Sequence, residues 1–243
     1  MTAPLRIAMW SGPRNLSTAL MYAFAARGDC AVWDEPFYAA YLDATGIDHP
    51  MRAEVIVAGE TDAGRVAAAC KGPVPGGMAI HYQKHMTLHM IPGFPRGWMR
   101  SCANVFLIRH PARVVASYAK KREGASAHDI GFEAQAQLYD EVAAWSGAPP
   151  PVIDSDDVRR DPEGMLTTLC RALGIPFTRR MLRWEAGGNP ADGAWAPHWY
   201  GAVHRSTGFE GAEGPLPQLG GRYRELAEEA MPFYERLAGA RER

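Results

Sequence analysis

Short apolar runs alternate with segments of helical periodicity from the first residues of the chain. Leu5 to Trp10 predicts a strand, and Ser17 to Arg27 predicts a helix that ends near Gly28, because its apolar residues repeat at helical spacing. The run from Asn104 to Ile108 is apolar almost throughout, which is typical of a strand that is covered on both faces. Strands that alternate with helices form parallel sheets. The sequence therefore predicts an α/β fold with a mostly parallel central sheet and flanking helices.

The remaining elements follow the same pattern. Further strands are predicted at three short apolar runs: Cys30 to Trp33, Met78 to Gln83 and Pro151 to Asp154. Further helices are predicted in two pieces over 50–70, from Ala112 to Arg122, from Gly131 to Trp145, and after Asp161-Pro162, where aspartate caps and proline opens the helix. The Gly-, Pro- and Trp-rich segment 187–221 predicts a long ordered loop or lid, and 222–238 predicts a C-terminal helix. At 243 residues, we expect one domain over 1–243.

Charge and cysteine usage exclude several classes of protein. The net charge is −1, so we expect neither a nucleic acid nor a membrane as a partner. The four cysteines lie far apart with no CxxC spacing, which argues against a zinc ribbon and fits a reducing compartment. No apolar stretch approaches the ~20 residues that cross a bilayer, and the N-terminus does not resemble a signal peptide. We therefore expect a cytoplasmic protein; the sequence gives no indication of its oligomeric state.

The first strand leads into the loop Ser11-Gly12-Pro13-Arg14-Asn15-Leu16 and then into a helix that begins with Ser17 and Thr18. At such a corner the free backbone N–H groups and the positive helix end converge on one point, which favours an anion. Arg14 and the hydroxyls of Ser17 and Thr18 are placed to bind its oxygens. Alternatively, the corner is an ordinary capped turn with Ser17 as N-cap. A nucleotide kinase would need GxxxxGK[ST], and this loop lacks the second glycine and the lysine.

A second strand-to-helix corner follows the apolar run at 104–108. Arg109 leaves the end of the strand, Pro111 opens the helix, and Ser117 lies about two turns along it. If the chain turns sharply at His110-Pro111, Arg109 and Ser117 can bind one phosphate. A salt bridge at the strand end would explain Arg109 equally well.

Together the two corners resemble those of the P-loop sulfotransferases, most closely a bacterial group of that family. Pro13 to Leu20 is similar to the family's PKSGTTWL-type loop, which binds the 5′-phosphosulfate end of 3′-phosphoadenosine 5′-phosphosulfate (PAPS). Arg109 and Ser117, spaced R-x7-S and followed by Tyr118, are similar to its site for the 3′-phosphate. The resemblance implies a three-layer P-loop sulfotransferase fold. It also implies PAPS as sulfuryl donor, the bisphosphate PAP as product, a hydroxyl or amine of a small molecule as acceptor, and no metal.

Two residues of the loop differ from the family pattern. The family's lysine is Arg14 here, which replaces a mobile point charge with a planar fork. Its loop glycine is Leu16, and leucine resists positive φ, so a different loop backbone is expected at this position.

Sulfuryl transfer needs a base for the acceptor's proton and cations for the charge that develops on the leaving phosphate. Glu35, at the end of the second strand, is the predicted base, since several sulfotransferases place a glutamate at this point. Alternatively, Asp34 and Glu35 merely cap the next segment.

The segment 81–89 offers rival groups. Lys84 is a candidate for contacting the transferred group, and His85 or His89 could serve as base, although neither has the family's spacing of a histidine two residues after the lysine. His81, His85 and His89 could instead bind zinc from one face of a helix, but this conflicts with the predicted strand and lacks an acidic fourth ligand.

Near the C-terminus, an aromatic loop containing Trp195 and Trp199 precedes Arg205. It resembles the family's segment that closes over the 3′-phosphate, which makes Arg205 a candidate ligand. The tryptophans either line the acceptor pocket or anchor the loop.

Other functions stay open on the residues alone. A kinase that uses ATP or GTP would need a P-loop lysine and a Walker B pair, and neither is evident. A non-catalytic PAP- or nucleotide-binding protein of the same fold would keep both corners. A pyridoxal phosphate enzyme is disfavoured by four lysines, none in a recognisable Schiff-base setting.

Overall fold

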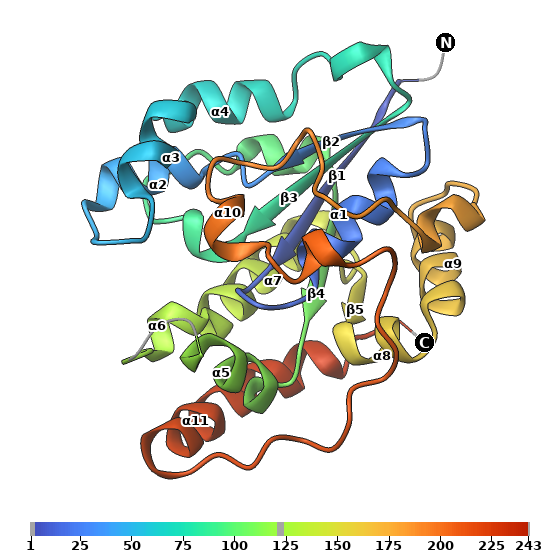
Figure 1. Cartoon of the computed structure of the whole chain (residues 1–243). Coiled ribbons are helices and arrows are strands. Elements are labelled where there is room, and N and C mark those ends of the chain that lie inside the picture. The colour runs from blue at the N-terminus through green and yellow to red at the C-terminus, as the bar shows by residue number, and fades with distance from the viewer. Residues whose placement is uncertain (1–2, 121–123, 243) are drawn as a thin grey trace.

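Within residues 3–120 and 124–242, which are the residues described, a computed structural model contains a parallel sheet of five strands (Figure 1). The strand order is β2-β3-β1-β4-β5, and every neighbouring pair is parallel. The strands are β1 (Leu5–Ser11), β2 (Cys30–Asp34), β3 (Ile80–Met86), β4 (Ala103–Ile108) and β5 (Val152–Asp154). The predicted fold class, a mostly parallel sheet with flanking helices, is confirmed.

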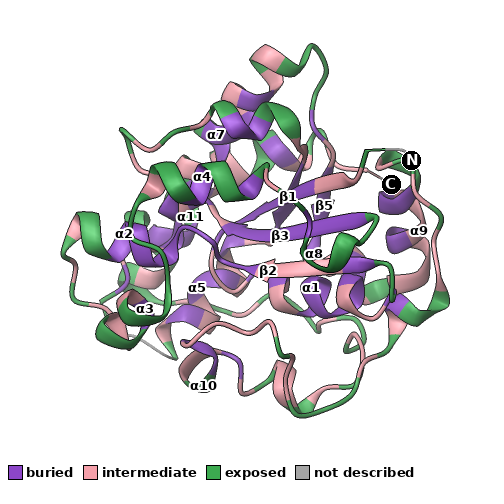
Figure 2. Cartoon of the chain, turned by 90° about the horizontal axis from the view of Figure 1, so that it is seen from above, coloured by how far each residue is buried: buried purple, intermediate pink, exposed green. Residues whose placement is uncertain are grey.

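Helices cover both faces of this sheet because side chains alternate along each strand. Ile7 and Met9 of β1 pack on one face, where α1 (Ser17–Ala25) and α9 (Pro162–Ala172) contribute to the same apolar cluster. Ala8 and Trp10 pack on the other face. There the cluster contains side chains of α4 (Ala63–Cys70), α7 (Phe132–Ser146) and α11 (Gly221–Ala238). The result is three layers with the buried strands in the middle (Figure 2).

The other helices are α2 (Tyr38–Thr45), α3 (Arg52–Ala58), α5 (Pro111–Ala119), α6 (Ala127–Ile130), α8 (Ser155–Arg160) and α10 (Ala196–Trp199). The sequence did not predict α2 or α8. Asp161 caps α9 as predicted, since its side chain accepts from the Gly164 N–H at 2.9 Å and Pro162 is the first helical residue. The predicted helix end at Arg122 lies outside the described residues. In the described part of the chain, no helix is both long and apolar enough to span a membrane.

The segment between α9 and α11 crosses the carboxyl end of the sheet (Figure 1). Trp195 and Tyr200 pack there against Tyr38 of α2, and the Gly193 N–H donates to the Asp34 carboxylate at 3.2 Å. This segment therefore closes over the edge of the sheet where the loops after β1, β2 and β4 emerge.

Candidate functional site

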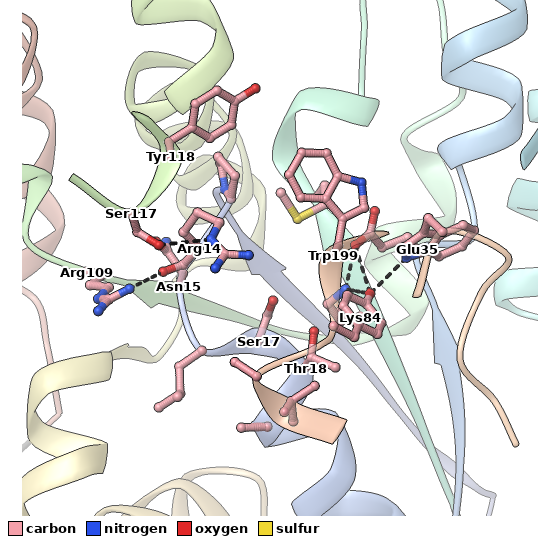
Figure 3. Close-up of a pocket in the computed structure, with 18 of the residues that line it drawn as sticks. Arg14, Asn15, Ser17, Thr18, Glu35, Lys84, Arg109, Ser117, Tyr118 and Trp199 are labelled. Atoms are coloured by element: carbon pink, nitrogen blue, oxygen red, sulfur yellow. Dashed lines mark hydrogen bonds and ion pairs between the residues drawn. The ribbon is translucent and has the colours of Figure 1, made fainter. Parts of the chain in front are cut away.

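A cavity of about 420 Å³ lies at this edge of the sheet, between the two strand-to-helix corners and the segment that crosses them (Figure 3). In open α/β sheets, ligands bind outside the carboxyl ends of the strands, which is where this cavity lies. Most of the predicted site residues line it: Pro13, Arg14, Asn15, Leu16, Ser17, Thr18, Glu35, Lys84, His89, Arg109 and Ser117. The structure thus brings both predicted phosphate corners and the predicted base to one cavity.

Arg14 links the two corners. Its Nε donates to Ser117 Oγ at 3.0 Å, and Arg109 Nη1 donates to the Arg14 carbonyl oxygen at 2.6 Å (Figure 3). Burial, and then the charge of Arg109, lower the pKa of Arg14. An anion bound between these guanidinium groups would offset that repulsion, so the residues present fit a phosphorylated ligand.

The loop backbone adopts conformations that usually need glycine. Arg14 has φ 61° and Leu16 has φ 67°, both in the left-handed region, at a cost of about 1–2 kcal/mol each. Leu16 thus adopts a positive φ, although leucine resists it. Its side chain packs against the core cluster on the α1 face of the sheet, which holds this conformation in place.

The start of α1 leaves its donors available. Leu16, not Ser17, is the N-cap residue, and no side chain caps the helix. In the described part of the chain, the hydroxyls of Ser17 and Thr18 make no side-chain hydrogen bond. Backbone N–H groups at the positive end of α1 therefore face the cavity together with two free hydroxyls, which is the arrangement that binds an anion.

The opposite end of the cavity holds a buried charge cluster around Lys84. Its ammonium donates to Asp34 Oδ1 at 2.8 Å, to Glu35 Oε1 at 2.5 Å and to the Tyr200 hydroxyl at 2.6 Å. Tyr200 in turn donates to Asp34 Oδ2 at 2.8 Å and accepts from Trp195 Nε1 at 2.8 Å. All three ammonium protons are used, so Lys84 holds the two carboxylates in place rather than pointing freely into the cavity.

Electrostatics favour this arrangement. Burial alone would lower the pKa of Lys84, but the charges of Asp34 and Glu35 outweigh it and raise that pKa, so the ammonium stays charged. Burial, and then the same two carboxylates, raise the pKa of Tyr200 well above its usual value, so the phenol keeps its proton. With both carboxylates ionised, the cluster carries a net charge of −1, opposite in sign to the arginine end.

The two carboxylate oxygens of Glu35 have different surroundings. Its Oε1 is bound by Lys84, whereas its Oε2 lies 3.9 Å from His89 Nε2, beyond hydrogen-bond distance. Glu35 has φ 40°, a further strained backbone position at the cavity. His89 stacks on Tyr38 and Tyr41, and burial, followed by the charge of Lys84, lowers its pKa well below the usual value.

Three predicted site residues do not line the cavity. His85 neighbours Lys84 on β3, so it points to the opposite face of the sheet, where it stacks on Trp10 with ring centres 4.6 Å apart. Gly12, at the start of the loop, packs closely on other backbone, since an added Cβ would come within 3.2 Å of the Ile130 carbonyl oxygen. Arg205 is exposed and lines a neighbouring surface hollow.

The zinc alternative is wrong in its geometry. β3 covers Ile80–Met86, so His81 and His85 lie on a strand, and His89 follows in a short turn. Among the described residues, no group of three or more His, Cys, Asp or Glu side chains is arranged to hold a metal ion.

Sequence reasoning missed two contributors to the site. From the sequence, Trp195 and Trp199 are the aromatic candidates beside Tyr200, and Asp34 is predicted only as a cap. The tyrosine meets Lys84 across 116 positions of sequence, so no local pattern could pair them. A buried lysine needs carboxylates nearby, and the adjacent Asp34-Glu35 pair was the signal that could have suggested the cluster.

The fold and the cavity define a class: an α/β protein of the P-loop type, with a cavity of about 420 Å³ between two strand-to-helix corners. Residues 5–241 match the family model described as "Sulfotransferase domain". The chain therefore belongs to the sulfotransferase family and has the P-loop sulfotransferase fold.

The chain is also similar to individual known proteins. The chain is 39% identical over 230 residues to "Branched-chain-amino-acid aminotransferase-like protein 2" of Arabidopsis thaliana, covering 94% of this chain and 40% of that protein. It thus spans about two fifths of that relative's length. Two solved structures share the fold: "Sulfotransferase Domain from the Curacin Biosynthetic Pathway" (TM-score 0.53, 15% identity, 96% and 98% of the two chains) and a sulfotransferase from Alicyclobacillus acidocaldarius (TM-score 0.52, 12% identity, 100% and 98%).

Proposed function

We propose that the chain transfers a sulfuryl group from PAPS to a hydroxyl or amine of a small-molecule acceptor. One observation carries the proposal: Arg14, Arg109 and Glu35 line the same cavity, so two anion-binding corners and a carboxylate face one ligand-sized space. A cation-rich end suits the donor, and an anionic end suits the atom that must lose a proton.

The first corner binds the 5′-phosphosulfate in this proposal. Backbone N–H groups at the start of α1 and the hydroxyls of Ser17 and Thr18 bind its oxygens. Arg14 would receive the negative charge that builds up on the 5′-phosphate as it leaves. The second corner, Arg109 with Ser117, binds the 3′-phosphate. For that, Arg109 must exchange its present partner, because its Nε donates to Glu213 Oε2 at 3.3 Å.

Glu35 acts as the base. Its Oε2 accepts the proton of the acceptor O–H or N–H while the acceptor atom forms a bond to sulfur. The bond between sulfur and the oxygen of the 5′-phosphate breaks, and its electron pair leaves with PAP. Lys84 and Tyr200 orient the carboxylate from behind through Lys84–Glu35 and Lys84–Tyr200 hydrogen bonds of 2.5 and 2.6 Å. We place the reaction in the cytoplasm, which the four free cysteines fit.

Calorimetric titration with PAP, ATP and adenosine 5′-phosphate, each with and without Mg²⁺, tests this proposal. We expect PAP to bind most tightly and without dependence on Mg²⁺. Arg109→Ala should weaken PAP binding by roughly 10-fold or more while affecting adenosine 5′-phosphate far less, since it removes charged hydrogen bonds to one phosphate. Arg224→Ala, an exposed arginine paired only within α11, serves as the control.

Three results would change the assignment. Tighter binding of ATP in the presence of Mg²⁺ would favour a kinase. Equal losses of PAP and adenosine 5′-phosphate affinity in Arg109→Ala would remove Arg109 from the 3′-phosphate site. PAP binding without turnover of any acceptor would make the chain a non-catalytic member of the family.

A further inference from the structure

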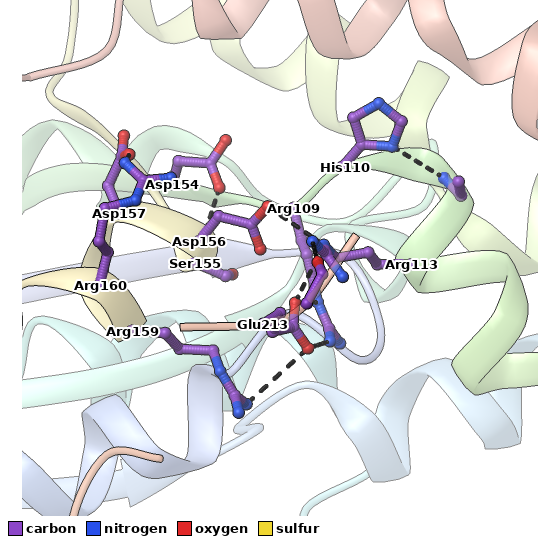
Figure 4. A network of polar contacts seen from close by, with 12 residues as sticks. Arg109, His110, Arg113, Asp154, Ser155, Asp156, Asp157, Arg159, Arg160 and Glu213 are labelled. Atoms are coloured by element: carbon purple, nitrogen blue, oxygen red, sulfur yellow. Dashed lines mark hydrogen bonds and ion pairs between the residues drawn. The ribbon is translucent and has the colours of Figure 1, made fainter. Parts of the chain in front are cut away.

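Three arginines from three different elements converge on one carboxylate beside the cavity (Figure 4). Arg109 follows β4, Arg113 lies on α5 and Arg159 lies on α8, and all three pair with Glu213 from the segment before α11. The Arg113 Nε lies 3.2 Å from Glu213 Oε2, and the Arg159 Nη1 lies 3.9 Å from Glu213 Oε1. All four side chains are largely buried, with 12–15% of their surface exposed.

One carboxylate cannot balance these three cations. Apart from Glu213, two acidic groups pair with these arginines: Asp156, whose Oδ2 accepts from Arg113 Nε at 3.1 Å, and Glu210, whose Oε2 accepts from Arg159 Nη2 at 2.8 Å. The Glu210 side chain is 66% exposed, so solvent screens its charge, whereas Asp156 is partly buried. The buried part of this set, three guanidinium groups and Asp156, sums to a charge of +2. A phosphate monoester carries about −1.5 to −2 at neutral pH, so it balances this set better than the single charge of Glu213 does.

Glu213 shares one of its cations with a second acidic group: Arg113 Nε lies 3.2 Å from Glu213 Oε2 and 3.1 Å from Asp156 Oδ2. Burial, and then a hydrogen bond with Glu213, raise the pKa of Asp156. For Glu213, burial is outweighed by hydrogen bonds with Asp156 and Arg109 and by the charges of Arg109 and Arg159, which lower its pKa and keep it charged. Glu213 belongs to a stretch without helix or strand, 211–220, whereas Asp156 is fixed on α8 with its backbone N–H bound to Asp154. Of the two, Glu213 is therefore the one that a ligand can displace.

Glu213 lies at the second strand-to-helix corner, the one that carries Arg109 and Ser117. Arg109, Arg159 and Glu213 line the same cavity as Arg14 and Ser117, and Arg109 bridges from Glu213 to the Arg14 carbonyl oxygen. The Glu213 carboxylate thus occupies an anion position at the end of the cavity opposite to Glu35.

We propose that Arg113 and Arg159 join Arg109 as ligands of the donor's 3′-phosphate, and that Glu213 holds this site as an internal carboxylate until the phosphate displaces it. The inference rests on the proposed function, because it assigns residues to a donor that carries a 3′-phosphate. It makes Arg113 and Arg159 binding residues and Glu213 a competitor of the ligand.

The arginines are tested by calorimetry with PAP and with adenosine 5′-phosphate, which differ only in the 3′-phosphate. Arg159→Ala and Arg113→Ala should each weaken PAP binding by roughly 10-fold or more and leave the affinity for adenosine 5′-phosphate within about 2-fold. The matched control is Arg160→Ala, on the same helix as Arg159, which is exposed and pairs with Asp157. Losses for PAP no larger than those of the control would overturn the assignment.

Glu213→Gln tests the competition. Removing the charge while keeping the shape should tighten PAP binding by about 10-fold, because the phosphate no longer displaces a charged partner, and should leave adenosine 5′-phosphate unaffected. Glu185→Gln, an exposed glutamate of a neighbouring loop, is the control. Unchanged or weaker PAP binding in Glu213→Gln would contradict the competitor role. If that variant does not fold, Glu213→Ala gives the same comparison.

The two proposals fail in different ways. If the wild-type chain binds PAP no more tightly than adenosine 5′-phosphate, the proposed donor is wrong and the further inference falls with it. If the wild type prefers PAP but substitutions of Arg113, Arg159 and Glu213 leave that preference unchanged, the donor stands and only the three-arginine site is wrong.

Discussion

Replacing Lys84 with methionine removes the cation at the centre of the buried charge cluster of Asp34, Glu35 and Tyr200, and keeps a side chain of similar length. Lys84 is 1% exposed, and its ammonium is the shared partner of Asp34, Glu35 and Tyr200. After the substitution, two buried carboxylates face each other across an apolar side chain. Asp34, at the end of β2, is 1% exposed and cannot reach water, and Glu35 is 10% exposed, on the side that lines the cavity.

The size of the effect follows from this burial. Removing one partner of a buried ion pair costs about 3–5 kcal/mol of unfolding free energy, because the remaining charge stays buried without compensation. For a domain of this length, each kcal/mol lowers Tm by about 2–4 °C, so Lys84→Met should lower Tm by roughly 6–20 °C. The double variant Lys84→Met/Asp34→Asn should recover part of that loss, since it removes one of the two stranded charges.

Urea unfolding and thermal unfolding followed by circular dichroism measure this prediction. Lys71→Met is the control, because Lys71 is exposed and its substitution should change the unfolding free energy by no more than about 0.5 kcal/mol. A loss for Lys84→Met as small as that of the control would refute the reasoning. So would a double variant that is less stable than the single one, because the carboxylates would then not be the source of the cost.

Three further outcomes test the site. Arg14→Ala should lower kcat by a larger factor than it weakens PAP binding, since the guanidinium acts on charge that develops in the transition state. Steady-state kinetics measure the first effect and calorimetry the second. An unchanged kcat would exclude Arg14 from the reaction. Glu35→Gln should lower kcat by roughly 10²-fold or more with PAP affinity retained, and a near-normal rate would shift the role of base to His89. Burial, and then the charge of His89, lower the pKa of His85 well below 6.5. The unfolded chain therefore binds a proton at this histidine more readily than the folded one, so the free energy of unfolding is highest above about pH 6.5 and falls as the pH falls. Urea unfolding at about pH 7.5 and about pH 5 should therefore show a larger loss for the wild type than for His85→Phe, and equal losses would contradict this.

Local patterns in the sequence predicted the scaffold of the site well. The strand–loop–helix corners at Arg14 and Arg109 depend on neighbouring residues, and both form where the sequence places them. The helix α2 was missed because it is short and follows directly on the strand end, where Pro36 indicates a turn. The strand β3 was predicted to end at Gln83 but continues to Met86. Because the strand includes residues 84–86, the alternation of side chains along it places His85 on the face opposite to Lys84.

Contacts between distant segments could not be predicted in this way. Arg205 was expected to close over the second corner from the C-terminal segment. Instead, Arg205 lines a neighbouring surface hollow, and the arginine that lines the cavity beside Arg109 is Arg159 of α8. The C-terminal segment contributes a carboxylate, Glu213, which pairs with Arg159. Which side chain of a long irregular loop reaches a site depends on how that loop packs, and neither spacing nor periodicity encodes it.

Both ends of the cavity carry their own counter-ions, and this follows from the cost of burying a charge without a partner. The two counter-ions differ in how firmly they are held. Lys84 is fixed on a central strand with all three protons donated, so exchanging it for a ligand would break three hydrogen bonds at once. Glu213 lies on an irregular loop, with 15% of its side chain exposed, and shares Arg113 with Asp156. If the chain acts as proposed, we therefore expect the end around Lys84 to keep its cation through a catalytic cycle and the end around Arg109 to exchange its carboxylate for a phosphate.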